Sequence, residues 1–387
     1  MHASHDRASM IFLRNVPRRE AATVALIIAS FILVGCGGSQ QTPAAAPPAP
    51  VNPSGVVTNT TAPWPVKTRE HLDLWLHGFA MIQPDTTRIP LFRRGYRDAM
   101  VVEKNRRGVT TLLDQNRDQL AARFAVNRNL IGAQFAALYF GSWEDMQQAI
   151  SIFLEAKGDP GRARTQQQQQ VIAFLAASFN TQADRDWLDL FAKSLADERD
   201  KFYHAYWLDQ QRSRGPVLAA VDSLWQKTYR PKLQTYLSRT QQENGDFILS
   251  LPLDGEGRTV SGGKRENIVA LTFPDTPAQA VDAIYVFTHE AMGTLAATAI
   301  ADNITPAERR EGLAEKMASA AAVRGGALLL QRAAPDLADG YARYYLKAAG
   351  LPATSGDAQA ALAAAFPLDA RVRDAIAGQI ASVYAGI

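Results

Sequence analysis

The stretch GDFILSLPLDGEGRTVSGGKRENIVALTF, residues 245–273, decides the fold class, because it interrupts a chain that otherwise reads as helical. GDFILSLPL and ENIVALTF are short β-type runs, and the connector between them, DGEGRTVSGGKR, is rich in turn residues. A helix should follow, because Thr276 suits an N-cap and Pro277 suits the first helical position. We expect this helix to continue to about Ala301.

Helical patterns lie on both sides of this stretch. The first one places its apolar residues on one helical face: Leu72, Trp75, Leu76, Phe79 and Ile82. Thr181 and Asp184 have the spacing of a capping box. After residue 305 helices resume, and one of them should end before Gly350. The sequence therefore predicts an α+β fold, a predominantly helical body with a small β-sheet preceding the helix that begins near Thr276.

The N-terminal residues 1–35 resemble a bacterial lipoprotein signal peptide. Arg14, Arg18 and Arg19 form a basic region before the apolar run AATVALIIASFILVG, which is shorter than the ~20 residues that span a bilayer. The run ends in LVGC, residues 33–36, which resembles a lipobox. The resemblance implies that Cys36 is lipidated and that the signal peptide is cleaved directly before it. The alternative is an uncleaved anchor with an incidental cysteine. Met10 is an alternative start to Met1.

The predicted anchor places the protein in the bacterial cell envelope, where lipid on Cys36 would hold it to the membrane. Gly37 is not the aspartate that retains lipoproteins in the inner membrane of some bacteria, so we expect the outer membrane, facing the periplasm. Cys36 is the only cysteine, which excludes disulfides and cysteine catalysis in the mature body. Residues 36–63 are uncharged and rich in Pro and Ala, which predicts a flexible tether.

The charge balance gives no reason to expect nucleic acid as a partner. The formal net charge is +3, and residues 1–35 contribute +2 of it through four arginines opposed by Asp6 and Glu20. The mature chain is therefore left near +1, without the basic excess that nucleic-acid binding requires.

The segment AIYVFTHEAMGTLAATA, residues 283–299, resembles the active-site helix of zincin metallopeptidases, of the type with a glutamate as third ligand. The resemblance implies His289 as a zinc ligand and Glu290 as the general base. Gly293 stands where the second histidine belongs, so the motif is degenerate. Glu311 and Glu315, on a following helix, are the alternatives for a third ligand. Zinc is thus a possible cofactor, although the missing second histidine favours a protein without a cofactor.

The other histidines do not clearly fill this vacancy. His71 and His77 are six residues apart, which places them about 120° apart on a helix and prevents them from chelating one ion together. His204, within FYHAYW, could approach the site only from a distant part of the sequence. A histidine packed at the start of a buried helix therefore remains the alternative to a metal ligand.

Two further groups of residues have two interpretations each. Asp254 and Glu256 in the connector are either an acid–base or calcium-binding pair or solvated turn carboxylates. The aromatic clusters either line a groove for a sugar or peptide or belong to the core. These clusters are Phe202, Tyr203, Tyr206 and Trp207, and Tyr341, Tyr344 and Tyr345.

We therefore expect four segments: a signal peptide (1–35), a tether (36–63), a helical domain (64–240) and a zincin-like α+β domain packed with C-terminal helices (241–387). Two functions stay open. The first is a non-catalytic envelope lipoprotein whose metallopeptidase-like domain binds a peptide or an envelope protein, or serves assembly. The second is an active zinc peptidase with an atypical ligand set.

The lipoprotein interpretation predicts the behaviour of a single substitution. Cys36→Ser removes the only thiol that can accept lipid, so labelling of the chain with a radioactive fatty acid and its retention in the membrane fraction should both be lost. A Cys36→Ser chain that still incorporates lipid would show that this interpretation is wrong.

Overall fold

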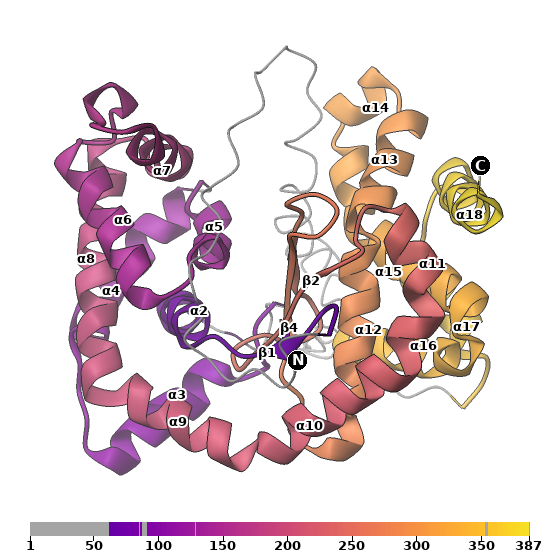
Figure 1. Ribbon diagram of the computed structural model, residues 1–387, viewed down its shortest axis with the longest axis horizontal. Helices are drawn as coiled ribbons and strands as arrows, with labels where there is room; N and C mark the ends of the chain where they lie inside the picture. The colour runs from indigo at the N-terminus through magenta and orange to yellow at the C-terminus, as the bar shows by residue number, and fades with distance from the viewer. Residues whose placement is uncertain (1–61, 85, 87–90, 128, 353–354, 387) are drawn as a thin grey trace, which may run out of the picture.

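The computed structural model describes residues 62–386 except 85, 87–90, 128 and 353–354, and it confirms the α+β class: many helices and one small sheet. The predicted signal peptide, Cys36 and nearly all of the predicted tether lie outside the described residues. Figure 1 shows the helices in two groups with the sheet between them. No helix of the described part combines the length and the apolar composition needed to cross a bilayer.

The sheet has four strands in the order β1-β2-β4-β3. These are β1 (Val66–Lys67), β2 (Gly245–Ser250), β3 (Arg258–Val260) and β4 (Asn267–Thr272). The two predicted β runs are β2 and β4, which pair parallel to each other. The connector forms a third strand, β3, antiparallel to β4, and Gly263 in their turn has a φ of +100°, which favours glycine.

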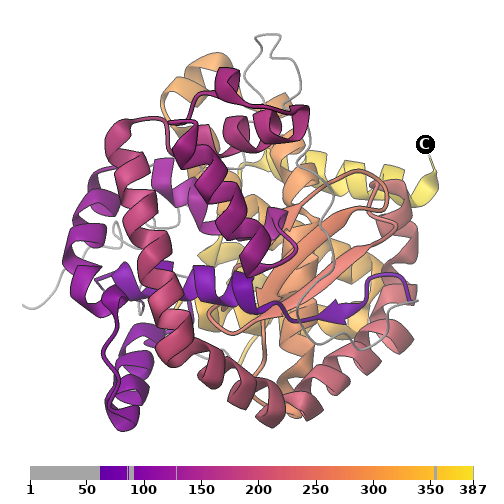
Figure 2. The ribbon, with the colours of Figure 1, turned by 60° about the vertical axis from the view of Figure 1, so that its left-hand side comes forward.

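The start of the folded chain belongs to this sheet. Val66 and Lys67 pair in parallel with Phe247 and Ile248 of β2. The Trp64 indole N–H donates to Gln242 O at 3.0 Å, and its ring meets Phe287 edge-on at 5.2 Å. In Figure 2, β1 lies beside the other strands and leads directly into the first helix. The first helical group is therefore an insertion between two neighbouring strands.

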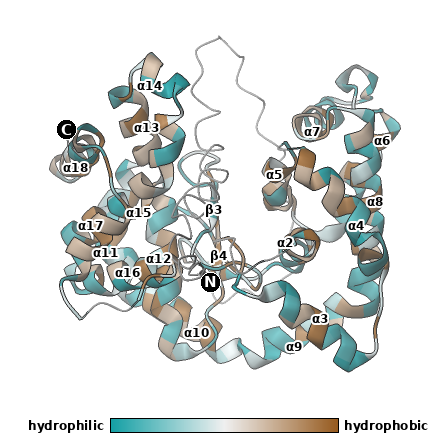
Figure 3. Ribbon diagram, turned by 180° about the vertical axis from the view of Figure 1, so that it is seen from behind, coloured by the Kyte–Doolittle hydropathy of each residue, from teal (hydrophilic) through white to brown (hydrophobic). Residues whose placement is uncertain are grey.

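The first helical group contains eight α-helices and the 3₁₀ helices η1 (Ala133–Tyr139) and η2 (Pro160–Arg162). The α-helices are α2 (Glu70–Ile82), α3 (Tyr96–Arg107), α4 (Leu112–Val126), α5 (Asn129–Gly132), α6 (Trp143–Glu155), α7 (Gln166–Ala176), α8 (Gln182–Glu198) and α9 (His204–Ser213). The predicted capping box of Thr181 and Asp184 is present at the start of α8. Figure 3 shows hydrophilic residues along α4 and α8, on the outside of the group.

The second group follows Arg214. Its first two helices, α10 and α11, therefore lie within the range 64–240 that the sequence assigned to the helical domain. It contains α10 (Gly215–Leu224), α11 (Arg230–Arg239), η5 (Pro277–Gln279), α12 (Ala280–Ala291), α13 (Gly293–Asn303), α14 (Pro306–Arg310), α15 (Leu313–Ala333), α16 (Pro335–Ala348), α17 (Ala358–Ala365) and α18 (Ala370–Ala385). Helix α10 packs beside α12, and α11 packs beside α18. The long helix expected from Thr276 to Ala301 is interrupted at Met292.

A cluster of aromatic rings joins the sheet to the second group. Phe287 of α12 stacks on Phe247 of β2 with ring centres 5.2 Å apart, and Trp225 lies 4.4 Å from Phe287. All three side chains are buried. Trp225 opens the π-helical turn Trp225–Tyr229 (η4) between α10 and α11. This contact fixes α12 against the sheet, and with it the position of His289.

Helix α2 is buried along its whole length, including its polar side chains. Asp73 accepts hydrogen bonds from the Trp207 indole at 3.0 Å and from the backbone of Leu251 at 3.2 Å. His77 donates to Glu198 at 2.9 Å, and Glu198 also pairs with Lys104 at 2.8 Å. Glu198 directly precedes the π-helical turn Arg199–Tyr203 (η3). Buried polar groups require such partners, so they fix α2 against α8, α9 and β2.

Asp73 makes the stability of the fold depend on pH. Burial raises the pKa of its carboxyl from 3.8 to about 7. Between about pH 4 and 7 the folded chain therefore keeps a proton that the unfolded chain releases, so stability falls as pH rises through this range and levels off above it. Asp73→Asn should remove this part of the slope, which is at most about 1.4 kcal/mol per pH unit. Urea unfolding of both chains at pH 5, 6, 7 and 8 measures the difference, and parallel profiles would contradict it.

Candidate functional site

His289 and Glu290 lie in the last turn of α12. The imidazole is 8% exposed, and its Nδ1–H donates to the neighbouring carboxylate of Glu290 at 2.9 Å. The ring stacks on Tyr345 of α16, with centres 5.4 Å apart and planes 25° apart. The two side chains of the predicted motif therefore bond to each other inside the second helical group.

The connector before β3 covers this pair. Gly257 N–H donates to Glu290 Oε1 at 3.1 Å, and the Tyr345 hydroxyl donates to Gly255 O at 3.1 Å. A Cβ placed on Gly257 would overlap the carbonyl oxygen of Ala270 and lie 3.1 Å from Glu290 Cγ. Only glycine fits at this position without a shift of the neighbouring strand, so the connector is held tightly against α12.

Glu256 adds a third ionisable group. Its Oε2 is shielded from solvent and has no hydrogen-bond partner among the described residues. Burial, with a smaller contribution from the charge of Glu290, raises the pKa of Glu256 to about 7 against the opposing effect of His289. Burial alone would lower the pKa of His289, but its hydrogen bond with Glu290 and the charges of Glu290 and Glu256 outweigh this and raise it. Glu256 thus places a second carboxyl close enough to the His289–Glu290 pair for their charges to interact.

The structure does not bring the predicted third ligands to His289. Glu311 is the exposed C-cap of α14, and Glu315 lies in the first turn of α15. Met292 contacts the same helix at Gly325, whose added Cβ would lie 2.9 Å from its methyl carbon. Gly325 is ten residues beyond Glu315, which separates them by about 15 Å along the helix. Within the described residues, no group of three or more His, Cys, Asp or Glu side chains could hold a metal ion.

No side chain of the described residues lies close to Gly293 in place of the missing second histidine. Gly293 begins α13, and Met292 N–H donates to His289 O at 3.2 Å, which tightens the turn between the two helices. A Cβ on Gly293 would meet nothing within 4 Å. The other candidate histidines stay in the first group: His71 contacts Phe140 O, and His204 donates to Glu70 at 2.9 Å.

The sequence singled out His289 and Glu290 as a pair, and it left Glu256 with two interpretations. Tyr341 and Tyr345 are buried, as the core interpretation predicts, and Tyr345 forms one wall of the site. Glu256 is half-buried, and its Oε2 is shielded from solvent where the connector folds back onto α12. The only sequence signal for this was its position between Gly255 and Gly257, which allows the backbone to approach the helix closely.

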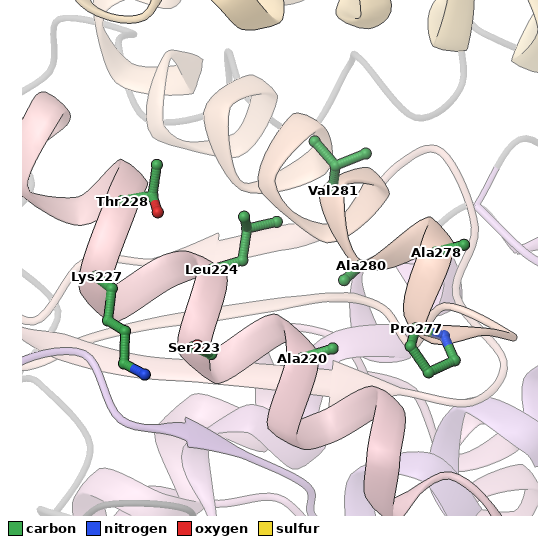
Figure 4. A pocket seen from close by; sticks show the side chains of 9 residues that line it. All are labelled: Ala220, Ser223, Leu224, Lys227, Thr228, Pro277, Ala278, Ala280 and Val281. Atoms are coloured by element: carbon green, nitrogen blue, oxygen red, sulfur yellow. The ribbon is translucent and has the colours of Figure 1, made fainter.

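The two clearest surface hollows lie elsewhere. Figure 4 shows the first, where Leu224 of α10 and Ala280 and Val281 of α12 line a shallow depression of about 440 Å³. The second lies between α13 and α18, where Leu295 and Val383 contribute to its lining. Neither includes His289, Glu290 or Glu256, so the buried polar cluster does not face either of these hollows.

Comparisons with known proteins give no family for this chain: no protein-family model matches it, and no curated protein and no solved structure shows significant similarity. The fold and the site therefore define it only as an α+β protein with a buried His–Glu pair under a glycine-rich connector. What the site does has to be argued from its geometry.

The close contact at Gly257 and the open space at Gly293 predict opposite effects of the same substitution. Gly257→Ala should lower the free energy of unfolding by about 1–3 kcal/mol, because the strand must shift to admit a methyl group. Gly293→Ala, the matched control, should raise it by up to about 1 kcal/mol, because alanine favours a helix. Chemical denaturation of both variants tests this pair. Equal effects would mean that the connector does not hold Glu290 as described.

Proposed function

We propose that this chain is a lipid-anchored envelope protein whose body binds or assembles with a peptide or protein partner without hydrolysing it. The observation that carries the proposal is that Glu290 Oε1 already accepts hydrogen bonds from Gly257 N–H and His289. A general base of a zinc peptidase needs its carboxylate directed at a metal-bound water. Here the carboxylate instead connects the connector to α12.

The ligand set supports the same proposal. A catalytic zinc site normally has three protein ligands and one open position. His289 has Gly293 where the second imidazole would be. Glu315 lies ten residues before the point where Met292 contacts α15, and Glu311 precedes that helix. The His–Glu pair then serves to order the connector, whose β3 strand forms an edge of the sheet.

The alternative, an active zinc peptidase with an atypical ligand set, is favoured by one observation. Glu256 Oε2 is a buried oxygen without a partner, and its charge interacts with both His289 and Glu290. A carboxylate oxygen and an imidazole nitrogen are both zinc ligands. Binding of zinc to the wild-type chain would therefore be the signature of this alternative.

The location rests on the sequence of residues 33–36, LVGC, which supports lipid attachment at Cys36. An attached lipid would hold the body at the membrane surface, with residues 36–63 between them. Such an arrangement suits a protein that captures or positions other envelope components. The partner class is then a peptide or an envelope protein, not a nucleic acid.

Zinc content separates the two functions. The purified wild-type chain should contain no stoichiometric zinc and show no shift of its melting temperature on addition of zinc or a chelator, because bound metal would stabilise the fold. Gly293→His supplies the second imidazole in open space and should bind zinc, whereas Gly293→Ala should not. Elemental analysis and thermal unfolding are the measurements. One zinc per wild-type chain, lost in His289→Ala, would establish the peptidase alternative instead.

A further inference from the structure

The N-terminus of α2 is buried and has no side-chain cap. Arg69 occupies the N-cap position with extended backbone, and its side chain makes no capping hydrogen bond to the first turn. The first N–H groups of a helix have no partner within the helix, and the helix dipole places partial positive charge there. Glu70, His71 and Leu72 of this turn are all buried. A buried, uncapped turn of this kind can bind an anion, provided that other groups complete the site.

Arg69 is the first such group. Its side chain is 1% exposed, and it makes one ion pair, from Nη2 to Asp246 Oδ2 at 2.6 Å. Its Nε and Nη1 are buried and have no hydrogen-bond partner. A guanidinium carries five N–H donors and no acceptor, so most of its donors remain available in this position. Unmatched buried donors of a charged group point to a ligand that accepts hydrogen bonds.

His71 supplies the complementary group. It is 1% exposed, and its Nε2 lies 2.9 Å from Phe140 O. A carbonyl oxygen only accepts, so Nε2 carries the proton. Burial and the nearby charge of Arg69 together lower the pKa of His71 to about 4, so the ring is neutral at pH 7. Nδ1 is then an unprotonated acceptor, and it is buried without a partner.

The sheet face beside this turn has an excess of positive charge. Lys67 pairs with Ile248 in register, Arg258 pairs with Ala270, and Ile248 pairs with Ala270, so both basic residues lie on the face that also carries Asp246. Asp246 is shared by Lys67 and Arg69. Arg258 lies 5.6 Å from the ring centre of Phe135 in η1, the segment that ends beside Phe140. This face therefore carries three cationic side chains, Lys67, Arg69 and Arg258, and one carboxylate, that of Asp246.

We propose that the N-terminus of α2 binds a small oxyanion that still carries a proton, of the phosphate type. Its charged oxygens would accept from the Nε and Nη1 groups of Arg69 and from N–H groups in the first turn of α2, and its P–OH group would donate to His71 Nδ1. Hydrogen phosphate has such a hydroxyl at pH 7, whereas sulfate has none. Lys67 and Asp246 are 14% and 20% exposed, so the edge of the site reaches solvent.

Binding of inorganic phosphate to the full chain tests this proposal. Isothermal titration calorimetry at pH 7 and constant ionic strength should give saturable binding of phosphate and at least tenfold weaker binding of sulfate and acetate. The reason is that a site built to accept a hydrogen bond rejects a ligand that cannot donate one. Absence of saturable phosphate binding would overturn the proposal, and so would equal binding of sulfate. Tighter binding of acetate would identify a carboxylate group as the ligand and overturn the phosphate assignment.

Two variants locate the site. His71→Phe removes the acceptor and should weaken phosphate at least tenfold, leaving phosphate and sulfate alike. His204→Phe is the matched control, because His204 contacts the same turn through Glu70 but is 48% exposed. It should leave phosphate affinity unchanged. Unchanged binding in His71→Phe would overturn the assignment to this turn.

A measurement on the wild-type chain covers the case in which His71→Phe does not fold. The ¹⁵N resonance of His71 Nδ1 should shift on addition of phosphate and stay in place on addition of sulfate, because hydrogen bonding to a bare imidazole nitrogen changes its shielding. A His71 resonance that does not respond to saturating phosphate would contradict the proposal whatever the variants do.

Discussion

Complete burial of α2 is the constraint on which the rest of the structure depends. A buried helix that carries Glu70, Asp73 and His77 is stable only if each polar group finds a partner, and the partners come from α8, α9 and the end of β2. Their positions therefore fix how the first helical group meets the sheet. The same constraint makes the unmatched nitrogens of Arg69 and His71 conspicuous, because they are exceptions within an otherwise satisfied helix.

Local features of the fold could be predicted from the sequence, because local interactions decide them. The capping box at Thr181 and the apolar face of α2 depend on residues within one or two turns. Non-local features could not be predicted in this way. Strand β1 has two residues and no pattern of its own, and it exists only because β2 is there to pair with it.

The candidate site divides in the same manner. The His289–Glu290 pair was visible as a motif, and the missing ligand at Gly293 was visible beside it. The sequence could not show that α15 would carry Glu315 away from His289, because ligand distances depend on how helices pack. Nor could it show that Glu256 would turn inward, since a carboxylate between two glycines is equally compatible with solvent. Burial of Glu256 depends on contacts with α12 and α16, which lie later in the chain.

Pairing of β1 with β2 has a consequence for the order in which the chain folds. The two strands are separated by about 180 residues, so the first strand emerges from the ribosome long before its neighbour exists. The first helical group can form local contacts during synthesis, but the sheet that anchors it closes only after β4 has followed. Closing so long a loop costs entropy before any strand contact compensates for it, which makes this pairing a late and slow step. Until then Val66 of β1 and the indole of Trp64 stay exposed, and a chaperone that shields them would protect the nascent chain from aggregation.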